Sequence, residues 1–183
     1  MSSIIDLGSG SKRDSRATDA LDFYAYPGVT VVHDLTKFPW PIPDGSFDEA
    51  ISHQVLEHLP HQEARAGEDL LFQFFDEVWR ILKPGGVFSF DVPEYRSSHA
   101  HNDLTHRRFF GVRAFNFLWT PERDSQYPRR PWGLVSARVD REYGWGVFDT
   151  WHVRKYAPWL DRVANRIGVG TPHYIYVVIR KPI

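Results

Sequence analysis

The chain has 183 residues, of which 42% are hydrophobic and 25% charged, and its formal net charge is −1. This size indicates one globular domain and excludes a multidomain assembly. The absence of cysteine excludes disulfide scaffolds, thiolate nucleophiles and cysteine-ligated metal sites. Because no apolar run of about 18 residues and no signal peptide occur, we expect a cytoplasmic protein without a membrane anchor.

Charge is unevenly distributed along the chain. Residues 1–95 carry 7 Lys or Arg against 16 Asp or Glu, whereas residues 96–183 carry 15 against 7. The two halves therefore have formal charges of −9 and +8. We expect one domain over residues 1–183 whose first half binds a cofactor and whose second half faces an acceptor. Five of the seven tryptophans lie in the second half: Trp119, Trp132, Trp145, Trp151 and Trp159.

Strand and helix patterns alternate in the first half. Apolar and β-branched runs predict strands at residues 3–7, within 16–22, and at 29–33, 47–52 and 87–92. Apolar residues at helical spacing predict a helix over 68–82 with an acidic first turn, which the turn Lys83-Pro84-Gly85-Gly86 ends. This alternation predicts a doubly wound, mostly parallel α/β sheet, with helices on both faces and ligands at the carboxyl ends of the strands.

The second half is less regular. Its patterns predict a strand over 134–141, a helix over 156–167 and a final strand over 174–180. Trp119, Trp132 and Trp145 lie among Pro, Gly and Arg without clear periodicity, so a loop region that covers the substrate and simple packing of a long insertion are both open.

A glycine turn follows the first predicted strand. In Asp6-Leu7-Gly8-Ser9-Gly10, an acid ends the strand and two glycines form the turn. Such a turn lets a ligand approach the backbone closely while the carboxylate accepts a hydrogen bond. A tight turn after an edge strand is the structural alternative. No Gly-Lys-Ser/Thr follows, so the turn does not indicate phosphate binding.

Several distant segments then form one pattern. The segments FPWP (38–41), SFDE (46–49), VLEHL (55–59) and LKPGG (82–86) occur in this order. With them, the chain resembles the class I S-adenosylmethionine-dependent methyltransferases of the methyltransferase type 11-like group, over residues 3 to 115. The resemblance implies a Rossmann-like sheet with an antiparallel last strand and S-adenosylmethionine as cofactor.

The resemblance also implies the cofactor contacts, which all lie at expected strand ends. The glycine turn would face the methionine part of the cofactor, Asp19 would bind the ribose hydroxyls with Asp22 as the alternative, and residues 34–35 would border the adenine. The implied cofactor-binding residues are Asp6, Gly8, Ser9, Gly10, Asp19, Asp34, Leu35 and His53. Because only Ser9 to Thr18 separate the glycine turn from Asp19, we expect the first helix to be shortened or missing, with this loop closing over the cofactor.

Three residues are candidates for catalysis. Methyl transfer to a hydroxyl requires an aligned acceptor and a group that removes its proton, and histidine suits proton removal near neutral pH. His58 lies in VLEHL, and Asp103 and His106 lie in a DLTH segment that the resemblance places beside the acceptor. A helix-end histidine bonded to backbone is the alternative for His58. We therefore predict methyl transfer to a small-molecule or glycan-like acceptor, at oxygen.

Two other functions stay open. The run from His99 to His106 approaches the H-x-H-x-D-H cluster of metallo-β-lactamase-like hydrolases, although two extra residues precede its last histidine. The shortened first motif also fits a protein that binds S-adenosylmethionine without turnover. The main interpretation includes no metal site.

The basic second half bears on the acceptor. Arginines near the DLTH segment predict a positive potential that suits an anionic or sugar-containing acceptor, unless the basic half only complements the acidic half. These arginines are Arg107, Arg108, Arg113, Arg129 and Arg130. A sequence pI of 6.8 does not indicate nucleic-acid binding.

Overall fold

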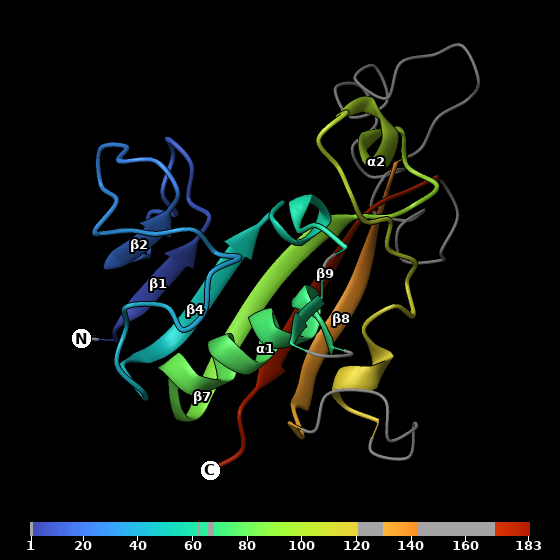
Figure 1. Ribbon diagram of the computed structural model, residues 1–183. Helices are drawn as coiled ribbons and strands as arrows, with labels where there is room; N and C mark the ends of the chain where they lie inside the picture. The colour runs from blue at the N-terminus through green and yellow to red at the C-terminus, as the bar shows by residue number, and fades with distance from the viewer. Residues whose placement is uncertain (1, 62, 66–67, 121–129, 143–170) are drawn as a thin grey trace.

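The computed structural model describes residues 2–61, 63–65, 68–120, 130–142 and 171–183 (Figure 1). In these ranges seven strands form one sheet in the order β3-β2-β1-β4-β7-β9-β8. The strands are β1 (Ile4–Leu7), β2 (Asp19–Asp22), β3 (Val31–Val32), β4 (Phe47–His53), β7 (Leu82–Pro93), β8 (Gly133–Glu142) and β9 (Thr171–Arg180). Two short strands, β5 (Glu63–Arg65) and β6 (Glu68–Asp69), form a separate antiparallel pair.

The direction of the strands agrees with the prediction. β3, β2, β1, β4 and β7 pair with one another in parallel, in this order. β9, the last strand in the chain, is antiparallel to both β7 and β8. The predicted Rossmann-like, mostly parallel sheet with an antiparallel last strand is therefore confirmed.

The connection between β1 and β2 contains no helix. Residues 8–18 form turns instead, with the amide of Lys12 donating to the carbonyl of Ser9 at 3.3 Å and that of Ala17 to the carbonyl of Asp14 at 3.0 Å. The expected loss of the first helix is confirmed, and polar contacts position this loop.

The helix α1 (Leu70–Ile81) begins two residues later than predicted. The acids expected in its first turn precede the helix, and Asp69 caps it by accepting a hydrogen bond from the amide of Leu71 at 2.8 Å. At the other end, the helix stops one residue earlier than predicted, because Leu82 is already extended and begins β7, which is longer than the predicted strand at 87–92.

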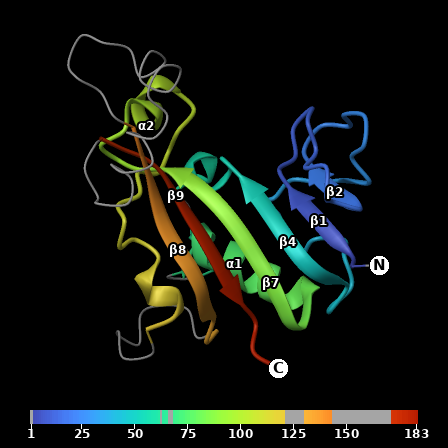
Figure 2. The ribbon, with the colours of Figure 1, turned by 180° about the vertical axis from the view of Figure 1, so that it is seen from behind.

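The sheet is covered by a helix on one face only, as far as the described residues extend. α1 lies in front of the sheet in Figure 1 and behind it in Figure 2, and the short helix α2 (Ser98–Asn102) lies beyond the carboxyl ends of the strands. Within the described ranges no helix covers the other face, because β1 and β2 are joined by a loop. The helix predicted at 156–167 lies outside the described residues, as do Trp145, Trp151 and Trp159. No described helix is long and apolar enough to cross a membrane.

The part of the core between α1 and β7 contains a cluster of aromatic rings. The Phe75 ring lies 6.0 Å from that of Phe88, 5.6 Å from that of Phe90 and 6.3 Å from that of Phe115, centroid to centroid. All four side chains are buried. Edge-to-face aromatic packing therefore fixes α1 over the strand that leads into the site.

We expect Phe75→Ala to lower the free energy of unfolding by roughly 3–5 kcal/mol, because it leaves a cavity among three other rings. Chemical denaturation followed by circular dichroism measures this change. Phe23→Ala is the control, since Phe23 is 59% exposed. A loss at Phe75 no larger than at Phe23 would contradict this account of the core.

Candidate active site

Most of the predicted site residues come together where the parallel strands of the sheet end, at their carboxyl ends; we call this end of the sheet the carboxyl edge. The parallel strands β1, β2, β4 and β7 all end there, as the arrowheads in Figure 1 show. In parallel sheets this carboxyl edge is where ligands bind. The loops that follow these strands carry most of the candidate residues.

The glycine turn has the conformation that glycine favours. Gly8 and Gly10 have φ values of +77° and +56°. A Cβ at Gly8 would lie 2.5 Å from Cγ2 of Val55, whereas a Cβ at Gly10 would meet no atom within 4 Å. Gly8 is thus required by packing against the loop after β4. Only at Gly10 does the turn have open space beside it. Ser9 lies between them, and its hydroxyl contacts the Gly10 carbonyl at 3.4 Å.

The placement of Asp19 at a strand end is wrong. Asp19 begins β2, where it pairs with Ile5 and its carboxylate accepts from the Thr18 hydroxyl at 2.9 Å. Asp22, the alternative, ends the strand, roughly 10 Å further along. Its carboxylate accepts from the amides of Gly10 at 2.8 Å and Tyr24 at 3.0 Å. The acid at the carboxyl edge is therefore Asp22, and it directly fixes the glycine turn.

Asp6 lies at the same edge and is buried, with 2% exposure. Burial raises the pKa of its carboxyl group above the ordinary value, although the carboxylate accepts a hydrogen bond from the amide of Asp14 at 2.7 Å. This bond ties the loop after β1 to the end of the strand. Asp6 therefore holds the loop in place.

Asp34 and Leu35 form the turn after β3. The Asp34 carboxylate accepts from the backbone amide of Thr36 at 2.8 Å and from its hydroxyl at 2.7 Å. Leu35 reaches the glycine turn, where its Cδ1 would lie 3.5 Å from a Cβ at Gly8. This turn thus contributes an apolar side chain and a fixed carboxylate near the cofactor-side residues.

His53 forms a charged bridge between two acids. Its Nδ1 contacts the carboxylate of Asp91 at the same level of β7, and its Nε2 lies 3.4 Å from the carboxylate of Asp14. The hydrogen bond to Asp91 raises the pKa of His53 from 6.5 to about 9, so the imidazole is charged at neutral pH. The side-chain amide of Gln54 also donates a hydrogen bond to the Asp91 carboxylate. Asp14, Gln54 and Asp91 did not emerge from the sequence, although an acid inside the apolar run 87–92 was a signal for Asp91.

His58 and Asp103 are joined through Thr105. The Thr105 hydroxyl donates to the Asp103 carboxylate at 2.6 Å, and this bond lowers the pKa of Asp103. With its proton used in this way, the Thr105 oxygen accepts from Nδ1 of His58 at 3.0 Å. Burial lowers the pKa of His58, so its ring is neutral and its Nε2 carries the free lone pair.

His106 lies against His58, with the ring centroids 4.7 Å apart. Its Nδ1 donates to the carbonyl of Ala100 at 2.9 Å, and its Nε2 lies 4.0 Å from Oε1 of Glu57. Glu57 is 1% exposed, and burial raises its pKa to about 8. Its carbonyl accepts from the amides of Arg107 and Arg108 at 2.6 and 3.0 Å, which joins this segment to the loop after β4. Sequence reasoning missed Glu57, because no local pattern around it marks its burial.

The metallohydrolase alternative is not supported by the structure. His101 donates from Nε2 to the carbonyl of Tyr95 at 2.7 Å and stacks on Phe109, while the ring of His99 lies 4.1 Å from that of His173. The predicted cluster of His99, His101, Asp103 and His106 therefore does not form one set of metal ligands. His99 and His101 belong to the short helix α2, where their rings contact His173 and Phe109.

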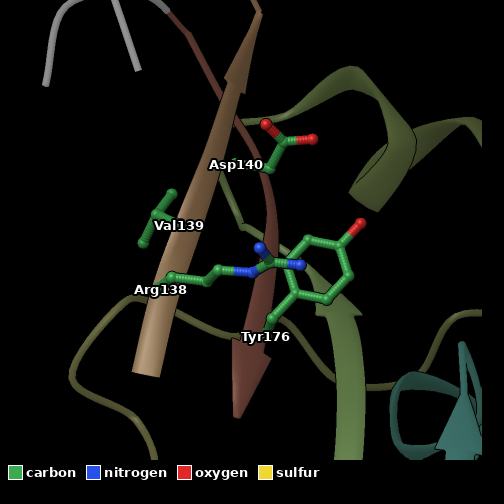
Figure 3. A pocket seen from close by; sticks show the side chains of 4 residues that line it. All are labelled: Arg138, Val139, Asp140 and Tyr176. Atoms are coloured by element: carbon green, nitrogen blue, oxygen red, sulfur yellow. The ribbon is translucent and has the colours of Figure 1, made fainter. Parts of the chain in front are cut away.

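A hollow of about 390 Å³ lies beside β8 and β9, lined by Arg138, Val139, Asp140 and Tyr176 (Figure 3). The guanidinium carbon of Arg138 lies 4.7 Å from the centre of the Tyr176 ring. Tyr176 pairs with Asp91 on one side and with Arg138 on the other. One row across the sheet therefore leads to this hollow, and its members are His53, Asp91, Tyr176 and Arg138.

Comparisons with known proteins agree with this architecture. Residues 5–90, from β1 into β7, match the family model of the methyltransferase domain. The predicted resemblance to class I S-adenosylmethionine-dependent methyltransferases is confirmed. A probable S-adenosylmethionine-dependent methyltransferase from Mycolicibacterium smegmatis is 39% identical over 69 residues, or 37% of this chain and 23% of the relative. The chain thus matches under a quarter of this relative's length.

Two solved methyltransferase structures share the fold. A SAM-dependent methyltransferase from Archaeoglobus fulgidus is 14% identical with a TM-score of 0.58, over 98% of this chain and 86% of that one. The 1,6-didemethyltoxoflavin-N1-methyltransferase of Burkholderia thailandensis, solved with 1,6-didemethyltoxoflavin and S-adenosylhomocysteine, is 16% identical with a TM-score of 0.54, over 100% of this chain and 72% of that one. At these identities the likeness shows the methyltransferase fold.

The contacts of His53 with Asp91 and Asp14 can be tested by measuring the pKa of its imidazole. We expect its imidazole to titrate near pH 9 in a proton–nitrogen NMR titration, and Asp91→Asn to return the pKa toward 6.5. Because the folded-state pKa is raised, the stabilisation from this pair is complete below pH 6.5 and lost as the pH rises through about 9. Asp14→Asn is the control and should shift the pKa less. Titration of His53 near 6.5 in the unmodified protein would disprove the bridge.

Proposed function

We propose that the protein transfers a methyl group from S-adenosylmethionine to a small-molecule acceptor, at oxygen. The proposal rests chiefly on the glycine turn at the carboxyl edge. There the Asp22 carboxylate holds the amide of Gly10, and the space that a Cβ of Gly10 would fill is open. A ligand can therefore approach this backbone closely, beside a carboxylate suited to a ribose.

The residues of the edge fit the parts of the cofactor. Asp22, instead of Asp19, accepts from the ribose hydroxyls with the lone pairs that its two amide contacts leave free. The turn at residues 34–35 borders the adenine, and Asp6, the 8–10 backbone and His53 face the methionine part. When bound, the cofactor supplies an electrophilic methyl group on a sulfonium.

The acceptor side is formed by His58 and His106. Each ring has its Nδ1 in a hydrogen bond, so each Nε2 offers a lone pair that can take the proton of a hydroxyl acceptor. Asp103 is a positioning residue, because it acts on His58 through Thr105. The proposal keeps a cofactor half (1–95) and an acceptor half (96–183), and it assigns His58 and Glu57 of the first half to the acceptor side.

Fewer arginines than expected are available to bind an anionic acceptor. Arg108 is 7% exposed and donates to the carbonyl of Leu59 at 2.8 Å and to Asp69 at 2.7 Å, so it serves the fold. Arg130 lies 3.4 Å from Asp76. Arg107 and Arg113 are exposed. Arg130 is exposed as well, but it is paired with Asp76, and Arg129 lies outside the described residues. An anionic or sugar-containing acceptor therefore rests on Arg107 and Arg113.

The tryptophans give weaker support for a sugar-containing acceptor. Trp132 is 3% exposed and packs edge-on against Trp79 at 4.8 Å, and Trp119 packs against the core. Packing therefore explains both of these rings. The cytoplasmic location stays a prediction of the sequence.

The ribose assignment can be tested with a matched pair of variants on one strand. We expect Asp22→Asn to weaken S-adenosylmethionine binding by about 10-fold or more, since an amide NH2 cannot accept from the ribose hydroxyls. Asp19→Asn is the control at the other end of β2 and should leave affinity unchanged. Isothermal titration calorimetry measures both, and equal affinities would remove Asp22 from the site.

Turnover can be tested by incubating the protein and isotopically labelled cofactor with a metabolite extract, and finding the product by mass spectrometry. We expect His106→Ala to lower turnover roughly 10²- to 10⁴-fold, with Asp103→Asn lowering it less. Cofactor affinity should stay nearly the same in both variants. His101→Ala, whose ring stacks on Phe109 outside the cluster, is the control. Cofactor binding without any labelled product would favour the non-catalytic alternative.

A further inference from the structure

Three side chains with metal-ligating atoms converge on the acceptor side. Glu57, His58 and His106 each offer one such atom, and the three atoms lie within 4.8 Å of one another. Glu57 and His58 belong to the 3₁₀-helix η1 (Leu56–His58) after β4, and His106 belongs to the segment after α2. The amides of Arg107 and Arg108 donate hydrogen bonds to the carbonyl of Glu57, and these bonds hold the two segments together.

The hydrogen bonds of the two histidines leave the same nitrogen free in each ring. Nδ1 of His106 donates to a backbone carbonyl, and Nδ1 of His58 donates to the Thr105 hydroxyl, which in turn donates to Asp103. Metal-ligating histidines commonly donate their second nitrogen to a carbonyl or carboxylate in this way, which fixes the tautomer and the ring orientation. Both rings are therefore prepared to bind through Nε2.

Glu57 supplies an independent observation. The residue is 1% exposed, and neither oxygen of its carboxyl group has a hydrogen-bond partner among the described residues. A buried carboxyl group without partners is unfavourable, and in folded proteins such groups are normally paired or bound to a metal. Its Oε1 lies 4.0 Å from Nε2 of His106, which is too long for a hydrogen bond. A metal ion bound to Oε1 of Glu57 and Nε2 of His106 would give each atom a partner.

We propose that Glu57, His58 and His106 bind a divalent first-row transition-metal ion, such as Zn²⁺. Two imidazoles and one carboxylate form a ligand set that such ions bind, with positions left open for water or a substrate. Its role in the reaction rests on the proposed function: an oxygen of the acceptor occupies an open position. With the ion bound, the Nε2 lone pairs serve as ligands, so the two histidines no longer take the acceptor proton themselves. They hold an ion that lowers the pKa of the acceptor hydroxyl, whose proton then passes to water.

Metal binding can be measured directly on protein without a polyhistidine tag, after the removal of bound metal with a chelator. Co²⁺ is the probe, because its visible absorption reports nitrogen and oxygen ligands, and calorimetry with Zn²⁺ gives stoichiometry and affinity. We expect one ion per chain. Glu57→Gln and His106→Ala should each weaken binding by roughly 100-fold or more, whereas His101→Ala should not change it.

The outcomes separate this proposal from the proposed function. Glu57→Gln keeps the shape of the side chain, and thermal unfolding of each variant shows that the fold is intact. If the unmodified protein binds S-adenosylmethionine but no Co²⁺, or if His101→Ala weakens Co²⁺ binding as much as His106→Ala, the metal site is disproved and the proposed function stands. If Co²⁺ binds as expected but S-adenosylmethionine does not, the metal site stands and the proposed function fails.

Discussion

β4 pairs in parallel with β1 on one side and with β7 on the other, and this pairing fixes the polar groups of the site. The register places Asp6 opposite Ile51 and His53 opposite Asp91. Side chains alternate between the faces of a sheet, so a slip of one residue would move them to the opposite face. The burial of Phe88 and Phe90 under α1 specifies the register, because the alternate residues of β7 must then face away from the helix.

The edge concentrates acidic groups around one histidine. Asp6, Asp14 and Asp91 all interact with the imidazole of His53, and Asp22 lies close enough to Asp6 to influence it. Asp6 and Asp22 also have structural partners, since each carboxylate accepts a hydrogen bond from a backbone amide. His53 thus balances charge that the fold places together for other reasons. The acceptor side differs, because its two imidazoles are held by neutral acceptors and face a buried carboxyl group.

The sequence could predict the fold further than the site. The mostly parallel sheet with its antiparallel last strand follows from the alternation of strand and helix patterns together with the family resemblance. The missing helix follows from the few residues between Gly10 and Asp19. The ribose-side acid could not be chosen, because both Asp19 and Asp22 fit a strand whose ends the pattern leaves open. Glu57 shows a second limit. Its burial depends on the approach of the 103–108 segment, a contact between distant parts of the chain.

The loop between β1 and β2 has a consequence for the timing of ligand exchange. Residues 8–18 are attached mainly by polar contacts, such as the amide of Asp14 on Asp6 and the side chain of Arg16 on Glu49 at 3.2 Å. Ala17 is the apolar side chain of this loop that is buried in the core. Opening such a segment exposes little apolar surface, so it costs far less free energy than melting the sheet. If the cofactor binds at the glycine turn as proposed, its entry and departure depend on local opening of this loop, independently of the global stability that the aromatic core provides.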